Sequence, residues 1–461
     1  MSLHYRPHDG YLGDVIPFYW QGEWHLFYLK AAPERFQGVP ITWEHISSRD
    51  LVHWLEWPTA LPAGAPGEPD ADGAWTGSVV EREGAFHIFY TGYSKRRDPM
   101  PQTICHATSS DLAHWRKDAA NPILLPDERW YSPGDWRDPF VYWNEGEGCY
   151  WMLICSRALS GLYNQRGALA LATSPDLERW QVQPPLWQPD LFYSAECPDM
   201  FRLGSRYYLV YSTYSPRFAT SYRFAESPRG PWLSPSSDNR LDDRLFYAAK
   251  TVSNGERRFA FGWVATLTGD RDGGEPQWAG HLGLPREVVA QEDGSLAFRC
   301  PPEVLALAGE PEPQSLHLYA GDWSSHNGGY RGERRDGLAY AAIADVGEPV
   351  VFEAEVTLAP GTACAGIGLS EHLLRLEARS GRAVLDSWPR AELRLDLPYG
   401  KPVRCRLFAA DGIIEAFVDD RLVLSVRAHA EWPLEAILFA EEGAATFRDV
   451  SVRRLGAEAM S

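Results

Sequence analysis

Three carboxylates in the chain each stand where a turn-like stretch runs into an aromatic, strand-like one, namely Asp14, Asp138 and Glu196. Carboxyl groups that share a small space raise one another's pKa, so one stays protonated while another is ionised. Glycoside hydrolysis needs carboxyl groups in different protonation states, because one protonates the leaving oxygen and another attacks or stabilises the anomeric carbon. The residue types therefore predict cleavage of a glycosidic bond, provided that the fold brings the three acids together.

Two other interpretations of the same acids stay open at this point. Each acid could cap a turn or pair with an arginine, and Arg137 stands directly beside Asp138. Three carboxylates could also bind Ca²⁺, although no dense Asp/Asn loop with calcium spacing accompanies them.

The elements that must position the acids recur along the first part of the chain. An aromatic and β-branched strand pattern appears five times, at 23–28, 85–90, 149–154, 206–211 and 257–263. A Ser/Asp turn that ends in Trp alternates with it, at 48–54, 110–115, 174–180 and, more weakly, 227–232. Two all-β motifs that alternate with the same spacing predict a five-bladed β-propeller with one sheet per repeat, rather than unrelated hairpins.

The repeat also predicts which residues meet at the propeller axis. The innermost strand of each blade precedes the recurring strand, and counting back 13 to 15 positions from its centre reaches Asp14, Asp138 and Glu196. These acids therefore belong to the first, third and fourth blades and should converge at one end of the axis. The equivalent stretches in the second and fifth blades are 75–78 and 246–250, and we expect Lys250 to be solvated.

The repeats stop after residue 287, and the composition changes. A stretch rich in Pro, Glu and Gly follows, and then short segments with period-2 alternation at 350–356, 373–378, 403–408 and 413–418. Such segments with tight turns between them predict an antiparallel β-sandwich. The expected organisation is a propeller over 1–305, a linker over 306–314 and a sandwich over 315–461, an all-β protein without long helices.

Composition limits the class of partner. The 461 residues carry a net charge of −18, which argues against binding to nucleic acid or to an anionic membrane. Aromatic residues make up 13% of the chain and include 19 Trp, a surplus that suits stacking on sugar rings. We therefore expect a small-molecule carbohydrate as the partner. The sequence does not indicate the oligomeric state.

Cysteine usage and the N-terminus bear on location. Seven cysteines, an odd number without a C-x-x-C pair, indicate neither a disulfide framework nor a zinc site. No stretch near the N-terminus is apolar enough for a signal peptide, and no run approaches the length of a membrane span. The expected location is the cytoplasm.

Several distinctive segments follow one another along nearly the whole chain. The first are the opening around Asp14 with His4 and Pro7, the His-Leu-Phe-Tyr strand at 25–28, and Trp-Glu-His at 43–45. The later ones are Trp-Thr-Gly-Ser at 75–78, Arg-Asp-Pro at 137–139, Glu-Cys-Pro at 196–198, Leu-Pro-Arg-Glu at 284–287 and the sandwich segment 414–420. In this order they resemble the segments of glycoside hydrolase family 32, the group of β-fructofuranosidases that includes invertases, levanases and inulinases.

The resemblance implies a retaining hydrolase of terminal β-fructofuranosides such as sucrose, fructo-oligosaccharides or fructans, with no cofactor and no metal. Asp14 would be the nucleophile and Glu196 the general acid and base. Asp138 would hold sugar hydroxyls and stabilise the transition state. Substrate contacts are implied for Tyr11, Trp43, His45, Trp75, Ser78 and Arg137. For Trp43, His45 and Trp75 a packing role is the alternative.

The sequence also departs from the family pattern around the nucleophile. Gly13 and Ile16 stand where the family has amide side chains, and Leu29 stands where it has Gln. A site that loses such donors discriminates hydroxyl groups differently. Three alternatives therefore remain: a fructosyltransferase, an inverting arabinofuranosidase or xylosidase of the other five-bladed families, and a carbohydrate-binding protein without catalysis. Cys197 is expected to be a small buried residue rather than a nucleophile.

Overall fold

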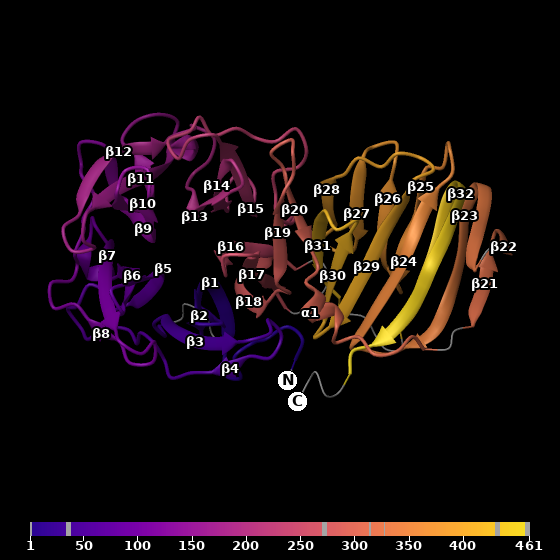
Figure 1. Ribbon diagram of the computed structural model, residues 1–461, viewed down its shortest axis with the longest axis horizontal. Helices are drawn as coiled ribbons and strands as arrows, with labels where there is room; N and C mark the ends of the chain where they lie inside the picture. The colour runs from indigo at the N-terminus through magenta and orange to yellow at the C-terminus, as the bar shows by residue number, and fades with distance from the viewer. Residues whose placement is uncertain are drawn as a thin grey trace.

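The protein folds into a β-propeller followed by a β-sandwich (Figure 1). The structure is a computed structural model that describes residues 2–33, 38–269, 274–312, 315–326, 328–428 and 434–456. Within these ranges the only α-helix is the single turn α1 (Pro302–Leu305), and no helix is long and apolar enough to cross a membrane. Short 3-10 turns η1 (Lys95–Arg97) and η2 (Tyr163–Gln165) lie in two loops.

Consecutive antiparallel strands form the propeller sheets. The first two groups are β1 (Tyr11–Trp20), β2 (Glu23–Ala31), β3 (Thr42–Ser48) and β4 (Leu55–Glu56), then β5 (Gly73–Arg82), β6 (Ala85–Tyr93), β7 (Gln102–Ser109) and β8 (Arg116–Lys117). The next two are β9 (Tyr131–Asn144), β10 (Cys149–Ala158), β11 (Gly167–Ser174) and β12 (Gln181–Trp187), then β13 (Glu196–Leu203), β14 (Arg206–Thr213) and β15 (Ala219–Ala225).

The last propeller strands are β16 (Phe246–Ser253), β17 (Arg258–Leu267) and β18 (Pro276–Leu282), with β19 (Arg286–Ala290) and β20 (Leu296–Arg299) at their outer side. Because Leu12 on β1 pairs with Gly280 on β18, this group and the first form one hydrogen-bonded sheet. The count of five blades therefore stays an interpretation of the strand grouping, whereas the propeller itself is clear.

The first strand of each group lines the axis, as the repeat predicts. β1 contacts β5 and β16, β5 contacts β9, β9 contacts β13, and β13 contacts β16, so the five strands close a ring (Figure 1). Large side chains buried between the sheets include Trp43, Trp136, Trp151 and Trp263.

The Ser/Asp turns secure the outer ends of the sheets. In the first copy, Asp50 Oδ1 accepts hydrogen bonds from the backbone of Val52 and His53. In the second copy the serine that bonds Asp111 is Ser109, one position before the Ser110 at which the predicted repeat begins. The leucine after the aspartate has a positive φ in the three strong copies, 71°, 64° and 67° at Leu51, Leu112 and Leu177.

Every strand at the axis carries a register irregularity at the same level. The shifts lie between Leu12 and Val15, Trp75 and Gly77, Glu196 and Asp199, and Tyr247 and Lys250, and the β9–β10 ladder shifts where Asp138 stands. A bulge re-aims side chains and interrupts strand pairing. These shifts turn the side chains of 14, 76, 138 and 196 toward one another.

The sandwich comprises β21 (Leu316–Ala320), β22 (Asp322–His326), β23 (Gly329–Val346), β24 (Val350–Leu358), β25 (Cys364–Leu369), β26 (His372–Glu377), β27 (Arg382–Asp386), β28 (Ala391–Arg394), β29 (Pro402–Ala410), β30 (Ile413–Val418), β31 (Leu422–Arg427) and β32 (Leu434–Arg454). The long strands β23 and β32 each pair with different strands along their two halves. The first half of β32 pairs with β25 and its second half with β24. Gly443 has φ 157° where β32 changes partner.

The two halves share buried contacts. Arg286 on β19 is fully buried and donates to Leu241 O, Asp242 and the Ser425 hydroxyl of β31. The apolar cluster of the last propeller strands also includes Phe408 and Phe417 of the sandwich. The predicted domain limits stay a prediction. In the structure α1 ends at Leu305 and β21 begins at Leu316, and residues 313–314 of the predicted linker lie outside the described part.

Candidate active site

The structure brings the three predicted acids together in one cavity at the propeller axis. Asp14 comes from β1, Asp138 from β9 and Glu196 from the first residue of β13. All three line a cavity of about 130 Å³, together with Arg137 and Trp75. The strands that carry the equivalent positions of the repeat therefore do meet.

Asp14 is held by two neutral donors from neighbouring strands. The Thr76 hydroxyl donates to Asp14 Oδ2 at 2.8 Å, and the Trp263 indole donates to Oδ1 at 3.1 Å. Burial raises the pKa of Asp14, the Thr76 hydrogen bond opposes that rise, and the charge of Glu196 adds to it. With both oxygens fixed, the carboxylate has a defined direction of approach to a ligand.

Glu196 is the most exposed of the three acids. Its side chain is 19% exposed, against 6% for Asp138, and Asp14 is buried. The Tyr247 hydroxyl donates to Oε2 at 2.6 Å and Arg137 donates to Oε1 at 3.0 Å. Burial raises the pKa of Glu196, Arg137 counteracts the rise, and the charge of Asp138 adds to it.

Asp138 has an unusual backbone conformation. Its φ is 59°, and its carboxylate accepts the Cys197 N–H at 3.0 Å. Its own N–H donates to the Thr91 hydroxyl at 2.8 Å. Burial raises the pKa of Asp138, Arg137 lowers it and the charge of Asp14 raises it. Backbone strain of this kind gathers at functional sites and must be held by the surrounding structure.

Cys197 lies between two of the acids as a buried thiol. Its Sγ is 3.7 Å from Asp14 Oδ2 and 3.8 Å from Asp138 Oδ2. Burial and the charges of Asp14 and Asp138 raise the pKa of Cys197 well above its usual value. A thiol that stays protonated donates weak hydrogen bonds to carboxylates and is a poor nucleophile. This agrees with the expected small buried residue.

Lys250 is buried beneath the acids, so the expectation of a solvated lysine is wrong. Its side chain is 2% exposed, and Nζ donates to Gly77 O at 2.6 Å. Its positive charge lowers the pKa of Asp14 and of Asp138. Lys250 and Tyr247 both belong to the stretch 246–250, which the repeat places at the axis. The sequence therefore indicated the position of both residues, but not their burial.

Arg137 connects the acids to the rim of the cavity. Besides Glu196, it donates to Asp135 at 2.5 Å, to the Ser194 hydroxyl at 3.3 Å and to Gln102 Oε1 at 3.3 Å. The sequence predicted this residue as a substrate contact. In the structure its guanidinium is buried and engaged by several protein groups.

The rest of the cavity wall is apolar. Leu29, Ile41, Trp75 and Trp278 line it opposite the acids. Leu29 is the residue that replaces the family's Gln, and no amide side chain takes its place among the lining residues. Of these four, the sequence had singled out only Trp75 as a wall.

Four predicted contact residues do not line this cavity. Trp43 is fully buried and its indole donates to Trp75 O at 3.0 Å. His45 stacks on Phe27 with ring centroids 4.1 Å apart and bonds His25. The Ser78 hydroxyl accepts the Val141 N–H. Tyr11 is half-buried, with the Arg6 guanidinium 5.2 Å from its ring. Each packs around the strands that carry the site, which matches the packing alternative for Trp43 and His45.

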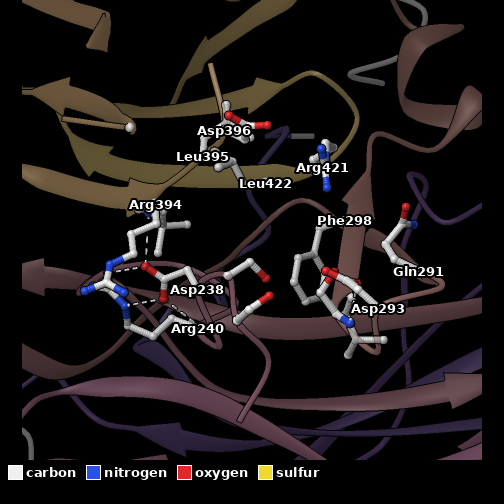
Figure 2. Close-up of a pocket in the computed structure, with 16 residues that line it drawn as sticks. Asp238, Arg240, Gln291, Asp293, Phe298, Arg394, Leu395, Asp396, Arg421 and Leu422 are labelled. Atoms are coloured by element: carbon white, nitrogen blue, oxygen red, sulfur yellow. Dashed lines mark hydrogen bonds and ion pairs between the residues drawn. The ribbon is translucent and has the colours of Figure 1, made fainter. Parts of the chain in front are cut away.

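A second, larger cavity lies where the propeller meets the sandwich (Figure 2). Its volume is about 430 Å³, and its wall includes Asp238, Arg240 and Arg394. Asp238 is engaged by the Arg240 side chain and by the backbone N–H of Arg394. Those contacts and the Arg240 charge lower the pKa of Asp238 although its burial raises it. Asp238 is thus engaged by protein groups, whereas the smaller axial cavity gathers three acids in one wall and is the better catalytic candidate.

The calcium interpretation finds no support in the ligand geometry. Among the described residues, no group of three His, Cys, Asp or Glu side chains is placed to hold a metal ion.

Comparison with known proteins points to one family. Residues 4–300 match the family model of the glycosyl hydrolases family 32 N-terminal domain. A fructan 1-exohydrolase of Triticum urartu is 30% identical over 351 residues, which is 70% of this chain and 58% of the wheat protein. A sucrose-6-phosphate hydrolase of Escherichia coli is 27% identical over 485 residues, 98% of this chain and 94% of that protein.

Solved structures of similar fold cover nearly the whole chain. The structure of a sucrose-6-phosphate hydrolase from Lactobacillus gasseri has a TM-score of 0.76 at 20% identity, and the match covers 99% of this chain and 93% of that one. The chain thus spans under two thirds of the wheat relative's length but nearly all of both bacterial proteins.

Proposed function

Because the chain belongs to glycoside hydrolase family 32, we propose that it hydrolyses a terminal furanoside, with a β-fructofuranoside as the first candidate. The observation that carries this proposal is the shared cavity of Asp14, Asp138 and Glu196. The names of its relatives, a fructan exohydrolase and a sucrose-6-phosphate hydrolase, support the choice of a fructoside.

We assign the roles from the surroundings of each acid. Asp14 is the nucleophile, because two neutral donors fix both of its oxygens without neutralising its charge. Glu196 is the general acid, because it is the most exposed of the three acids and a leaving group departs toward solvent. Asp138, held by the Cys197 N–H, orients sugar hydroxyls and stabilises positive charge at the anomeric carbon.

The reaction then proceeds in two displacements. Asp14 attacks the anomeric carbon while Glu196 gives its proton to the leaving oxygen, and a glycosyl ester on Asp14 results. After the leaving group departs, Glu196 takes a proton from water, and that water displaces Asp14 with overall retention. If a sugar hydroxyl replaces the water, the same steps give a transferase.

Arg137 is the one cation among the described residues that line the cavity, and its contacts favour a neutral substrate over a phosphorylated one. It is engaged by Asp135, Ser194 and Glu196. A phosphate bound here would compete with those buried contacts. An arabinofuranoside is the second candidate, because Leu29 and Ile41 offer no hydrogen bonds and this sugar has fewer hydroxyl groups to satisfy.

A substrate panel with matched variants tests the proposal. Sucrose, fructo-oligosaccharides, inulin, levan and aryl arabinofuranosides are assayed with the wild type, Asp14→Asn, Glu196→Gln and the control Glu83→Gln, whose side chain is 81% exposed. We expect turnover of at least one furanoside and a loss of at least about 10³-fold in kcat for the two site variants only. Near-normal rates in either site variant would refute the roles. NMR of the first product anomer separates retention from inversion.

A further inference from the structure

The loops at the catalytic end of the propeller can be identified from strand register. On β13, Glu196 pairs with Ser212 near the end of β14, and on β9, Tyr131 pairs with Ala158 at the end of β10. The loops that follow β10 and β14, and the loop that leads into β13, therefore open beside the acids. They surround the mouth on the side of Glu196.

Three tyrosines from these loops form a continuous aromatic surface. The ring centroids of Tyr163 and Tyr193 are 5.7 Å apart, and those of Tyr193 and Tyr214 are 5.6 Å apart. Tyr163 is 62% exposed and Tyr214 44%. Leu162 and Leu191, 71% and 51% exposed, flank the tyrosines in sequence. We call Tyr163, Tyr193 and Tyr214 the tyrosine platform.

Arg157 holds the platform in place without leaving a free charge on it. Its guanidinium lies 4.6 Å from the Tyr163 ring and 3.7 Å from the Tyr193 ring. It also donates to Tyr163 O and lies 3.7 Å from the Asp135 carboxylate. Cation–π attraction to one buried guanidinium therefore fixes the two rings relative to each other.

Two short chains of polar contacts connect the platform to the general acid. Asp135, beside Arg157, bonds Arg137, which donates to Glu196 Oε1. The Ser194 hydroxyl bonds the same guanidinium. Burial raises the pKa of Tyr214, and the charge of Arg137 and a hydrogen bond with Ser194 oppose that rise. None of the platform residues lines the axial cavity itself. The platform therefore lies just outside the sugar site, beside the carboxyl that protonates the departing oxygen.

We propose that the tyrosine platform binds the leaving group and favours one with a flat apolar surface, such as an aryl or arylalkyl aglycone. Three rings with exposed leucines near them offer stacking area to a flat apolar group. The inference rests on the proposed function, because it places the aglycone next to Glu196.

A pair of substrates isolates this contribution. Methyl and benzyl β-fructofuranosides, or the matching arabinofuranosides, carry leaving groups of similar acidity, so they make equal demands on Glu196. We expect wild-type kcat/KM to be at least about tenfold higher for the benzyl glycoside, in line with one or two stacking contacts. Equal values in the wild type would overturn the proposal without any variant.

Variants then locate the effect. Tyr163→Ala and Tyr214→Ala should each lower the benzyl-to-methyl ratio of kcat/KM by about three- to tenfold. The control Tyr319→Ala removes a tyrosine of similar exposure, 52%, from the sandwich and should keep the wild-type ratio. A ratio unchanged in the platform variants, or an equal loss on both substrates, would contradict the proposal.

Binding separates failure of the platform from failure of the proposed function. If no furanoside is turned over, the proposed function fails, and calorimetric titration of the wild type with both glycosides still tests the platform. Tighter binding of the benzyl glycoside, weakened in Tyr163→Ala, would support the platform. Equal binding, or none, would overturn it.

Discussion

The indole of Trp278 occupies the space beside Gly13 that any side chain at position 13 would fill. A Cβ on Gly13 would lie 2.5 Å from Trp278 Cζ2 and 2.6 Å from Cη2. Trp278 also lines the cavity next to the nucleophile. The indole of Trp278 and a side chain at position 13 therefore exclude each other in this part of the cavity wall.

Gly13→Ala should therefore be destabilising, because the methyl group overlaps a packed ring on a buried strand. We expect a loss of about 1–3 kcal/mol in the free energy of unfolding, measured by urea denaturation, and a lower kcat/KM as the indole moves. Gly134→Ala is the control, since a Cβ there meets nothing within 4 Å. In the Trp278→Ala background the cost of Gly13→Ala should largely vanish. An equal cost in both backgrounds would disprove the steric relationship.

Lys250→Met should move the acidic limb of the pH–rate profile to higher pH. The buried ammonium lowers the pKa of Asp14, so its removal raises that pKa, and the ionised nucleophile is lost at a higher pH. The measurement is kcat/KM against pH, with the exposed Lys95→Met as control. An acidic limb that stays in place or moves to lower pH would contradict the arrangement.

Tyr247→Phe should act on the opposite limb. The Tyr247 hydrogen bond stabilises the Glu196 carboxylate and lowers its pKa, so the variant keeps Glu196 protonated to higher pH. The alkaline limb of kcat/KM then moves up, while kcat falls because the carboxyl is less firmly oriented. The same profile measured for Tyr319→Phe should match the wild type. A shift of the alkaline limb to lower pH would be incompatible with Glu196 as the acid.

Arg286→Met tests the junction of propeller and sandwich. The change removes the cation paired with the buried Asp242 carboxylate, and breaking such a pair costs about 3–5 kcal/mol. The same guanidinium also lies 3.7 Å from the buried Glu415. Arg179→Met, at a site 81% exposed, should change stability by less than about 1 kcal/mol. Adding Asp242→Asn to Arg286→Met should restore part of the loss in denaturant unfolding. No recovery in the double variant would show that the pairing is not the cause.

The part of the site that follows the repeat was predictable. Asp14, Asp138 and Glu196 stand at equivalent positions of strands whose order the repeat reveals, and ring closure then makes them neighbours. The same positions in the other two axial strands supplied Thr76 and Lys250, within stretches that the repeat had marked.

The other features of the site depend on local backbone geometry and packing, which the sequence pattern does not reveal. Asp138, Cys197 and Ala248 have φ of 59°, 48° and 51° without being glycine, and these bulges aim the site. Trp278 belongs to β18, outside the counted strands, so its contact with Gly13 had no sequence signal. Conversely, Trp43 and His45 belong to family segments but pack outside the cavity. A sequence motif does not distinguish a residue that lines a cavity from one that packs behind it.

The most direct test of the central claim is mass spectrometry of Glu196→Gln mixed with a furanoside that has a good leaving group. Such a substrate needs little acid assistance to form the ester, whereas its hydrolysis lacks the base. The account predicts a protein heavier by one glycosyl group, attached to the peptide that contains Asp14. Turnover without such an adduct, or an adduct on any other residue, would contradict it.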